Sequence, residues 1–136
     1  MMKWILSFMA LLLLAGCTVP EKTVEPVEDV PGYRQIRMDE AIAMMEEESG
    51  YILLDVRTPE KFTDTHIPGA INVANEAISL KEIPELPDKG QLILVYCRSG
   101  NRRKQASQKL ADLGYTNIVE IGGINDWSGE VVTGAE

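Results

Sequence analysis

Short apolar runs alternate with amphipathic stretches along the chain from residue 33 onward. The runs at 52–56 and 92–96 are almost continuously apolar, which is typical of strands buried on both faces of a parallel sheet. Shorter strands are expected at 33–37, 70–73 and 117–121. Because strands and helices alternate, the pattern predicts an α/β domain with a mainly parallel sheet.

The stretches between these strands carry helix signals. Asp39 is expected to cap a helix that runs to Ser49, because Gly50 follows as a stop. The stretch 103–113 has apolar residues three and four positions apart, so one face of this helix should pack on the sheet. Further helices are expected at 59–65 and, weakly, at 75–82, with a short helical turn that ends at Trp127.

The first 32 residues follow a different pattern. Lys3 precedes an apolar run at 4–14, which has the form of a secretory signal and is shorter than the ~20 residues that span a bilayer. The next residues complete a segment, Leu-Ala-Gly-Cys at 14–17, that resembles the lipobox of bacterial lipoproteins. The resemblance implies a signal peptide at 1–16 and a lipid on Cys17, and residues 17–32 should form an acidic, proline-containing tether. We therefore expect an extracytoplasmic protein that its lipid anchors to a bacterial membrane. An ordinary cleaved signal is the alternative.

Length and charge restrict the possible functions. A chain of 136 residues, 45% of them hydrophobic, has room for one folded domain, expected at 33–136. Asp and Glu outnumber Lys and Arg 21 to 13, and this excess argues against nucleic acid as a partner. A basic cluster stands out against that background and comprises Arg98, Arg102, Arg103 and Lys104.

Cys97 is the strongest candidate for chemistry. The sequence holds one other cysteine, and a lipid on Cys17 would rule out a disulfide within the chain. A single buried cysteine is more often a small apolar residue of the core. The residues that follow Cys97 are Arg, Ser, Gly and Asn, which indicate a polar loop and therefore a reactive thiol.

The position of Cys97 between two elements favours an activated thiol. It comes directly after the most apolar strand, and a helix is expected five or six residues later. Ligands of parallel sheets bind beyond the carboxyl ends of the strands. Gly100 lets the loop turn tightly, so that its backbone N–H groups and the helix N-terminus can face an anion. Such a loop stabilises a thiolate, and the basic cluster would attract small anionic sulfur donors.

Four segments resemble motifs of the rhodanese family, in the family's order, over about residues 33–134. The resemblance implies a rhodanese-like three-layer α/β domain with helices on both faces of the sheet. It also implies a sulfurtransferase in which Cys97 takes sulfane sulfur from a donor such as thiosulfate and passes it on from a persulfide. The segments are ILLDVRTPE at 52–60, HIPGAIN at 66–72, CRSGNR at 97–102 and GGINDW at 122–127.

The resemblance further assigns roles around Cys97. Backbone amides of the loop would cradle the outer sulfur, and no metal or organic cofactor is implied. The partners would be a small sulfur-containing anion and a thiol acceptor, which can belong to another protein, and we expect a monomer. The arginine side chains of the loop either steer the substrate or are plain exposed charges. The cradle comprises Arg98, Ser99, Gly100, Asn101 and Arg102.

Other residues of the motifs are expected to support the structure. Asp55 should hydrogen-bond at the base of the active loop, and Arg57 should pair with Glu60. His66 should be a structural hydrogen-bonding residue, and Trp127 should pack at the end of the sheet.

Two other functions fit parts of the sequence. Cys97 and Arg103 satisfy the C-x5-R spacing of cysteine phosphatases, and Arg103 stands where rhodaneses usually have a small residue. The loop CRSGNR fits sulfur transfer better, because a phosphate needs a roomier loop. The other alternative is a rhodanese-like fold used only for binding or regulation. Such copies often lack the cysteine that this chain retains.

Overall fold

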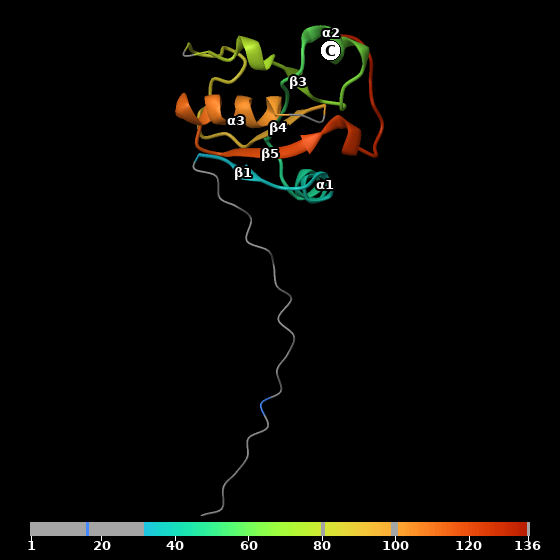
Figure 1. Ribbon diagram of the computed structural model, residues 1–136. Helices are drawn as coiled ribbons and strands as arrows, with labels where there is room; N and C mark the ends of the chain where they lie inside the picture. Colours follow the sequence, from blue (N-terminus) through green and yellow to red (C-terminus); the bar gives the residue numbers. More distant parts are fainter. Residues whose placement is uncertain (1–15, 17–31, 80, 99–100, 136) are drawn as a thin grey trace, which may run out of the picture.

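The computed structural model describes residues 16, 32–79, 81–98 and 101–135. In these ranges the strands form one parallel sheet in the order β1-β5-β4-β2-β3 (Figure 1). This arrangement confirms the α/β class and the parallel sheet expected from the apolar runs. The elements are β1 (Arg34–Gln35), α1 (Met38–Glu47), β2 (Ile52–Asp55), α2 (Pro59–Asp64), β3 (Ile71–Asn72), η1 (Asn75–Ala77), β4 (Ile93–Cys97), α3 (Arg102–Asp112), β5 (Ile118–Gly123) and η2 (Ile124–Asp126).

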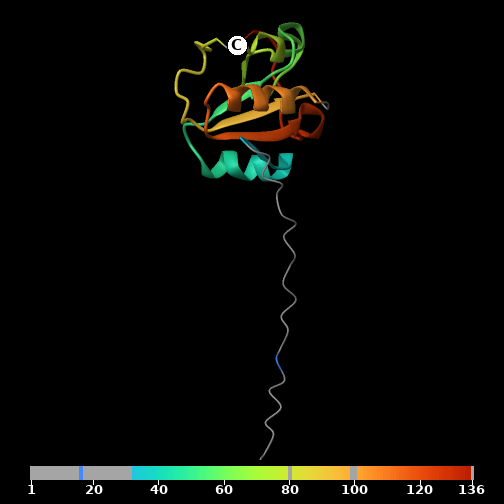
Figure 2. The ribbon, with the colours of Figure 1, turned by 60° about the vertical axis from the view of Figure 1, so that its left-hand side comes forward.

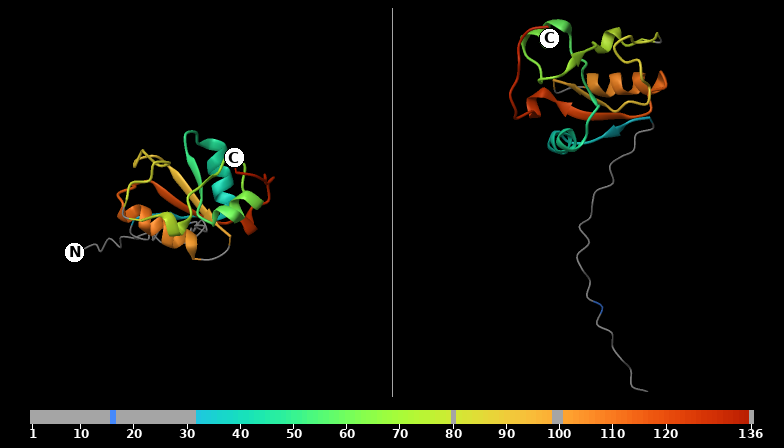
Figure 3. Two further views of the ribbon diagram at one scale, coloured as in Figure 1. Left: turned by 90° about the horizontal axis from the view of Figure 1, so that it is seen from above. Right: turned by 180° about the vertical axis from the view of Figure 1, so that it is seen from behind.

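Strand β4 lies in the middle of the sheet, and all of its residues are buried. Successive side chains of a strand point to opposite faces, so β4 contributes to two cores. Val95 and Cys97 pack in a core beneath α3, whereas Leu94 and Tyr96 pack in a core with residues of α1 and α2. Figures 1 and 2 show α1 and α3 on opposite faces of the sheet, and the view from behind in Figure 3 agrees. The expected three layers are therefore present.

The pairing of β4 with β5 shifts near its end. Val95 lies opposite Glu120, but the next residue, Tyr96, lies opposite Gly122, so Ile121 is an extra residue in β5. This bulge is accommodated at Gly122, whose φ of +103° is a conformation that residues with a Cβ rarely adopt. The ladder then continues, and it extends β4 as far as Cys97 opposite Gly123.

Several boundaries differ from the sequence prediction. Helix α1 begins at Met38 with Arg37 as its N-cap, so the predicted N-cap at Asp39 is wrong. The Asp39 carboxylate instead accepts a hydrogen bond from Arg37 Nε, at 3.0 Å. The predicted helix at 75–82 is reduced to the single turn η1, because Ile78 and Ile83 insert into the core beneath α3.

The predictions for the N-terminal region fall outside the described residues. Residues 1–15 and 17–31, and with them Cys17 and nearly all of the expected signal and tether, are not described, and Gly16 is described as exposed. Within the ranges that the structure describes, no helix is both long and apolar enough to cross a membrane.

Candidate active site

Cys97 is the last residue of the central strand, at the carboxyl end where ligands of parallel sheets bind. Its side chain is only 1% exposed and packs in the core beneath α3. The sequence predicted Cys97 at the carboxyl end of the central strand, and this position is confirmed. It also predicted that Cys97 is the first residue of the polar loop, and this part is wrong because Cys97 still belongs to β4. The bulge in β5 carries the ladder one residue further, so the polar loop begins at Arg98.

Arg103 approaches the thiol from the first turn of α3. Its Nη1 donates a hydrogen bond to Cys97 Sγ at 3.8 Å, and its Nε donates to the carboxylate Oε1 of Glu120. Burial by itself would lower the pKa of Arg103, but the hydrogen bond to Cys97 and the charge of Glu120 outweigh it, and the pKa is raised. A permanent cation therefore lies beside the sulfur.

Glu120, in the middle of β5, holds Arg103 in place. The side chains of Arg103 and Glu120 are 19% and 5% exposed, so their ion pair is largely removed from water. Glu120 Oε1 also accepts the backbone N–H of Gly122 at 3.0 Å, inside the bulge. Sequence reasoning missed Glu120. Its one signal is that it is the only charged residue in the strand IVEIGG.

The structure describes three of the five predicted cradle residues, because Ser99 and Gly100 lie outside the described ranges. Arg98 and Asn101 are exposed. Arg102 turns away from the thiol, and its Nη1 lies 3.0 Å from Oε1 of Glu76 in a partly exposed ion pair. The Cys97 sulfur accepts a hydrogen bond from Arg103, the next arginine of the basic cluster.

The Asp55 carboxylate binds Arg57 at the end of β2, on the other face of the sheet. Arg57 Nη2 donates to Asp55 Oδ2 at 2.7 Å, and Nε and the backbone N–H donate to Oδ1 at 3.0 and 2.9 Å. The predicted pair of Arg57 with Glu60 is therefore wrong. Asp55 accepts its side-chain hydrogen bonds from Arg57 and not at the base of the active loop, where the sequence predicted them. Glu60 is exposed to water, whereas the fully buried Asp55 requires a charged partner.

His66 and Trp127 have the structural roles that the sequence predicted. His66 is 1% exposed, stacks on Phe62 with ring centroids 3.8 Å apart, and its Nδ1 lies 2.9 Å from the Phe62 carbonyl oxygen. The indole of Trp127 packs against the core on the α1 face and donates from Nε1 to the carbonyl of Glu130 at 3.0 Å.

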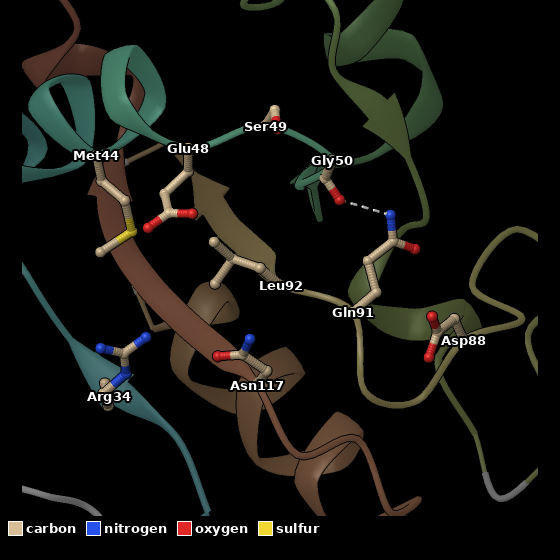
Figure 4. Close-up of a pocket in the computed structure, with 9 residues that line it drawn as sticks. All are labelled: Arg34, Met44, Glu48, Ser49, Gly50, Asp88, Gln91, Leu92 and Asn117. Atoms are coloured by element: carbon tan, nitrogen blue, oxygen red, sulfur yellow. Dashed lines mark hydrogen bonds between the residues drawn. The ribbon is translucent and has the colours of Figure 1, made fainter.

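A hollow of about 480 Å³ lies at the opposite end of the sheet (Figure 4). Gly50, Leu92 and Asn117 place it just before β2, β4 and β5, and Gln91 Nε2 closes one side by donating to the Gly50 carbonyl at 2.8 Å. No cysteine or histidine is among the residues that line this hollow. The hollow therefore lies away from Cys97, which is at the carboxyl end of β4. The lining residues are Arg34, Met44, Glu48, Ser49, Gly50, Asp88, Gln91, Leu92 and Asn117.

The site can activate a sulfur nucleophile with a cation and a helix N-terminus. Helix α3 starts five residues after Cys97, and its first turn adds partial positive charge near the sulfur. A cation and a helix N-terminus are the features that stabilise thiolates in proteins. Among the residues that the structure describes, no three His, Cys, Asp or Glu side chains gather as metal ligands.

The chain is similar to known proteins in sequence and in fold. A family model described as "Rhodanese-like domain" matches residues 37–130. Thiosulfate sulfurtransferase PspE of Escherichia coli is 36% identical over 73 residues, which cover 54% of this chain and 70% of that protein. Adenylyltransferase and sulfurtransferase UBA4 of Candida albicans is 33% identical over 116 residues, which cover 80% of this chain but 26% of that protein. A solved structure, "rhodanese with anions from E. coli", matches with a TM-score of 0.56 and 34% identity over 62% of this chain and 99% of that one.

Proposed function

The chain belongs to the rhodanese-like family, and from this premise we propose that it transfers sulfane sulfur through a persulfide on Cys97. Relatives named as thiosulfate sulfurtransferases support an enzyme of the sulfurtransferase type. The observation that carries the proposal is the contact between Arg103 Nη1 and Cys97 Sγ at the end of the central strand. It supplies positive charge where a thiolate and a persulfide would carry negative charge.

The proposed reaction has two steps. The Cys97 thiolate attacks the outer sulfur of thiosulfate, the S–S bond of the donor breaks, and its electron pair leaves with sulfite. A thiophilic acceptor, such as the thiolate of a small molecule or of a partner protein, then attacks the outer sulfur of the persulfide. This second displacement returns Cys97 to the thiolate and needs no oxidant, metal or organic cofactor.

The neighbouring residues support the two steps in different ways. The backbone amides of residues 98–102 would hold the outer sulfur, and the exposed Arg98 would attract the anionic donor. Asp55 and Arg57 would fix the end of β2, which pairs with β4 next to Cys97.

Turnover with thiosulfate and a thiol acceptor tests this function. The full chain should release sulfite continuously, and Cys97→Ser should release none while it unfolds at a similar temperature. Sulfite release by folded Cys97→Ser at the rate of the unmodified chain would overturn the proposal.

One observation keeps the phosphatase as a second candidate. Arg103, the arginine of the C-x5-R spacing, does lie against Cys97 Sγ, as an arginine that binds a phosphoryl group would. An aryl phosphate separates the two functions, because only a phosphatase would hydrolyse it with turnover that requires Cys97. We expect no such turnover.

We also propose that a lipid on Cys17 anchors the chain to a bacterial membrane on the extracytoplasmic side. The support is the segment at 14–17 and the apolar run before it. Cys17→Ala should move the protein from the membrane fraction to the soluble fraction. An equal share in the membrane fraction for both proteins would contradict the anchor.

A further inference from the structure

We propose that Arg103 is a catalytic residue of this sulfur transfer, and that Glu120 positions it so that its Nη1 donates a hydrogen bond to the Cys97 sulfur. This inference rests on the proposed function and extends it to two residues outside the loop CRSGNR. Arg103 would hold negative charge on the sulfur twice in each cycle, first on the thiolate that attacks the donor and then on the persulfide that results.

The three residues come from three neighbouring elements. Cys97 ends β4, Glu120 lies in the adjacent strand β5, and Arg103 lies in the first turn of α3, which packs on both strands. The helix axis and the two paired strands limit where each side chain can reach. The contact of Arg103 with Cys97 therefore rests on how α3 packs against β4 and β5.

The planar guanidinium explains how Glu120 can aim the group. Glu120 accepts from Nε while Nη1 donates to Cys97 Sγ at 3.8 Å, so two atoms of one rigid plane have fixed partners. Glu120 is itself fixed, because its Oε1 also accepts the N–H of Gly122 at 3.0 Å. The bulge in β5 thus determines where the cation lies. A lysine has one point charge on a flexible chain, and it could not reproduce this pair of contacts.

Burial separates Arg103 from the other basic residues of the cluster. The Arg103 side chain is 19% exposed, whereas that of Arg102 is 42% exposed and lies against Glu76. Charges that are shielded from water interact more strongly and are screened less by salt. The effect on the sulfur should therefore come from Arg103, although Arg102 and Lys104 carry the same charge.

The main test replaces the pair without leaving a buried carboxylate alone. Arg103→Met alone would leave Glu120 buried and unpaired, which can prevent folding, so the double variant Arg103→Met/Glu120→Gln is used beside it. In the double variant Met cannot donate to sulfur, and Gln can still accept from Gly122. Arg34→Gln, which removes a charge at the far end of the sheet, is the matched control.

Two reagents distinguish stabilisation of the sulfur from binding of an anionic donor. The double variant should react about 10- to 100-fold more slowly with thiosulfate, the loss expected for one charge-assisted hydrogen bond to a reacting atom. Cys97 should be alkylated by the uncharged reagent iodoacetamide with a similar loss, and the thiolate absorbance (the difference from Cys97→Ser) should fall. Arg34→Gln should match the unmodified chain in the rate with thiosulfate, the rate of alkylation and the thiolate absorbance. A loss with thiosulfate alone would mean that Arg103 only binds the donor, and this result would overturn the inference.

Single variants test the positioning role of Glu120. Arg103→Lys should have a kcat between those of the double variant and the unmodified chain, because lysine restores the positive charge but not the planar guanidinium. Glu120→Gln should lower kcat less than the double variant does and change KM little. If Glu120→Gln keeps or raises kcat, Glu120 does not position Arg103.

The inference and the proposed function can fail separately. If the unmodified chain takes up sulfur on Cys97 and the double variant does so at the same rate, the inference fails and the proposed function stands. If the unmodified chain takes up none, the proposed function itself fails.

Discussion

Two buried guanidinium–carboxylate pairs flank the carboxyl end of the sheet, one on each face. Arg57 and Asp55 lie on the face with α1 and α2, and Arg103 and Glu120 lie on the face with α3. The pairs are chemically alike, but the remaining N–H groups of the two arginines point to different partners. Arg57 Nη2 also donates to the carbonyl of Thr65 at 2.5 Å, whereas Arg103 Nη1 donates to the Cys97 sulfur.

We propose that this difference separates a structural pair from a functional one. Arg57 closes a local turn and joins the end of β2 to the end of α2, so its loss should be seen in stability. Arg103 joins a helix to a strand through the Cys97 sulfur, so on the proposed function its loss should be seen in rate. On this proposal the two ion pairs differ in role because their arginines differ in their third contact.

The largest expected effect is on stability, at Asp55. Asp55→Ala leaves the Arg57 guanidinium buried without its carboxylate, and the free energy of unfolding should fall by about 3–5 kcal/mol. Denaturant unfolding measures this change. Asp39→Ala is the matched control, since Asp39 also pairs with an arginine two residues away but is exposed, and its loss should be far smaller because water screens the pair. Equal losses in the two variants would contradict the structural role of the buried pair.

The Asp55 face should also be sensitive to alkali through Tyr96. Burial and the charge of Asp55 raise the pKa of Tyr96 above its ordinary value of 10.0. A raised pKa means that the folded state keeps its proton longer, so the stabilisation is complete below pH 10 and is lost as the pH rises through the folded pKa. The stability of the unmodified chain should therefore fall above pH 10, by up to ~1.4 kcal/mol per pH unit, and Tyr96→Phe should flatten this slope. Unfolding curves at several alkaline pH values measure it, and identical slopes would assign the sensitivity to another group.

The smallest effect is expected for the exposed pair of Arg102 with Glu76. Glu76→Gln removes one partner of an ion pair whose side chains are both well exposed, and the free energy of unfolding should change by about 0.5 kcal/mol or less. Denaturant unfolding at low and high salt tests this. A loss as large as that of Asp55→Ala would show that burial does not separate the pairs in the way proposed.

The parallel sheet and its central strand could be predicted from the sequence, because continuous apolar runs of strand length are typical of strands buried on both faces of a parallel sheet. Cys97 could be singled out because a polar, glycine-containing loop follows one of these runs. The pair of Arg103 with Glu120 could not be predicted. It depends on a shift of register between β4 and β5, and nothing in the local pattern of IVEIGG specifies which strand residue meets α3.

Two of the wrong predictions share one physical cause, which is that burial overrode local spacing. Glu60 has a helical spacing from Arg57, but the buried Asp55 needs the cation more than an exposed glutamate does. The stretch after η1 was expected to be helical, but Ile78, Ile83 and Leu86 fill the core beneath α3 and draw the chain out of that helix. Helix propensity decides the conformation of such a segment only when no tertiary contact competes with it.

The intact mass of the protein after incubation with thiosulfate shows whether Cys97 carries the transferred sulfur. The unmodified chain should gain the mass of one sulfur atom, a thiol reductant should remove it, and Cys97→Ser should gain nothing. The same gain in both proteins, or no gain in either, would mean that Cys97 is not the sulfur carrier.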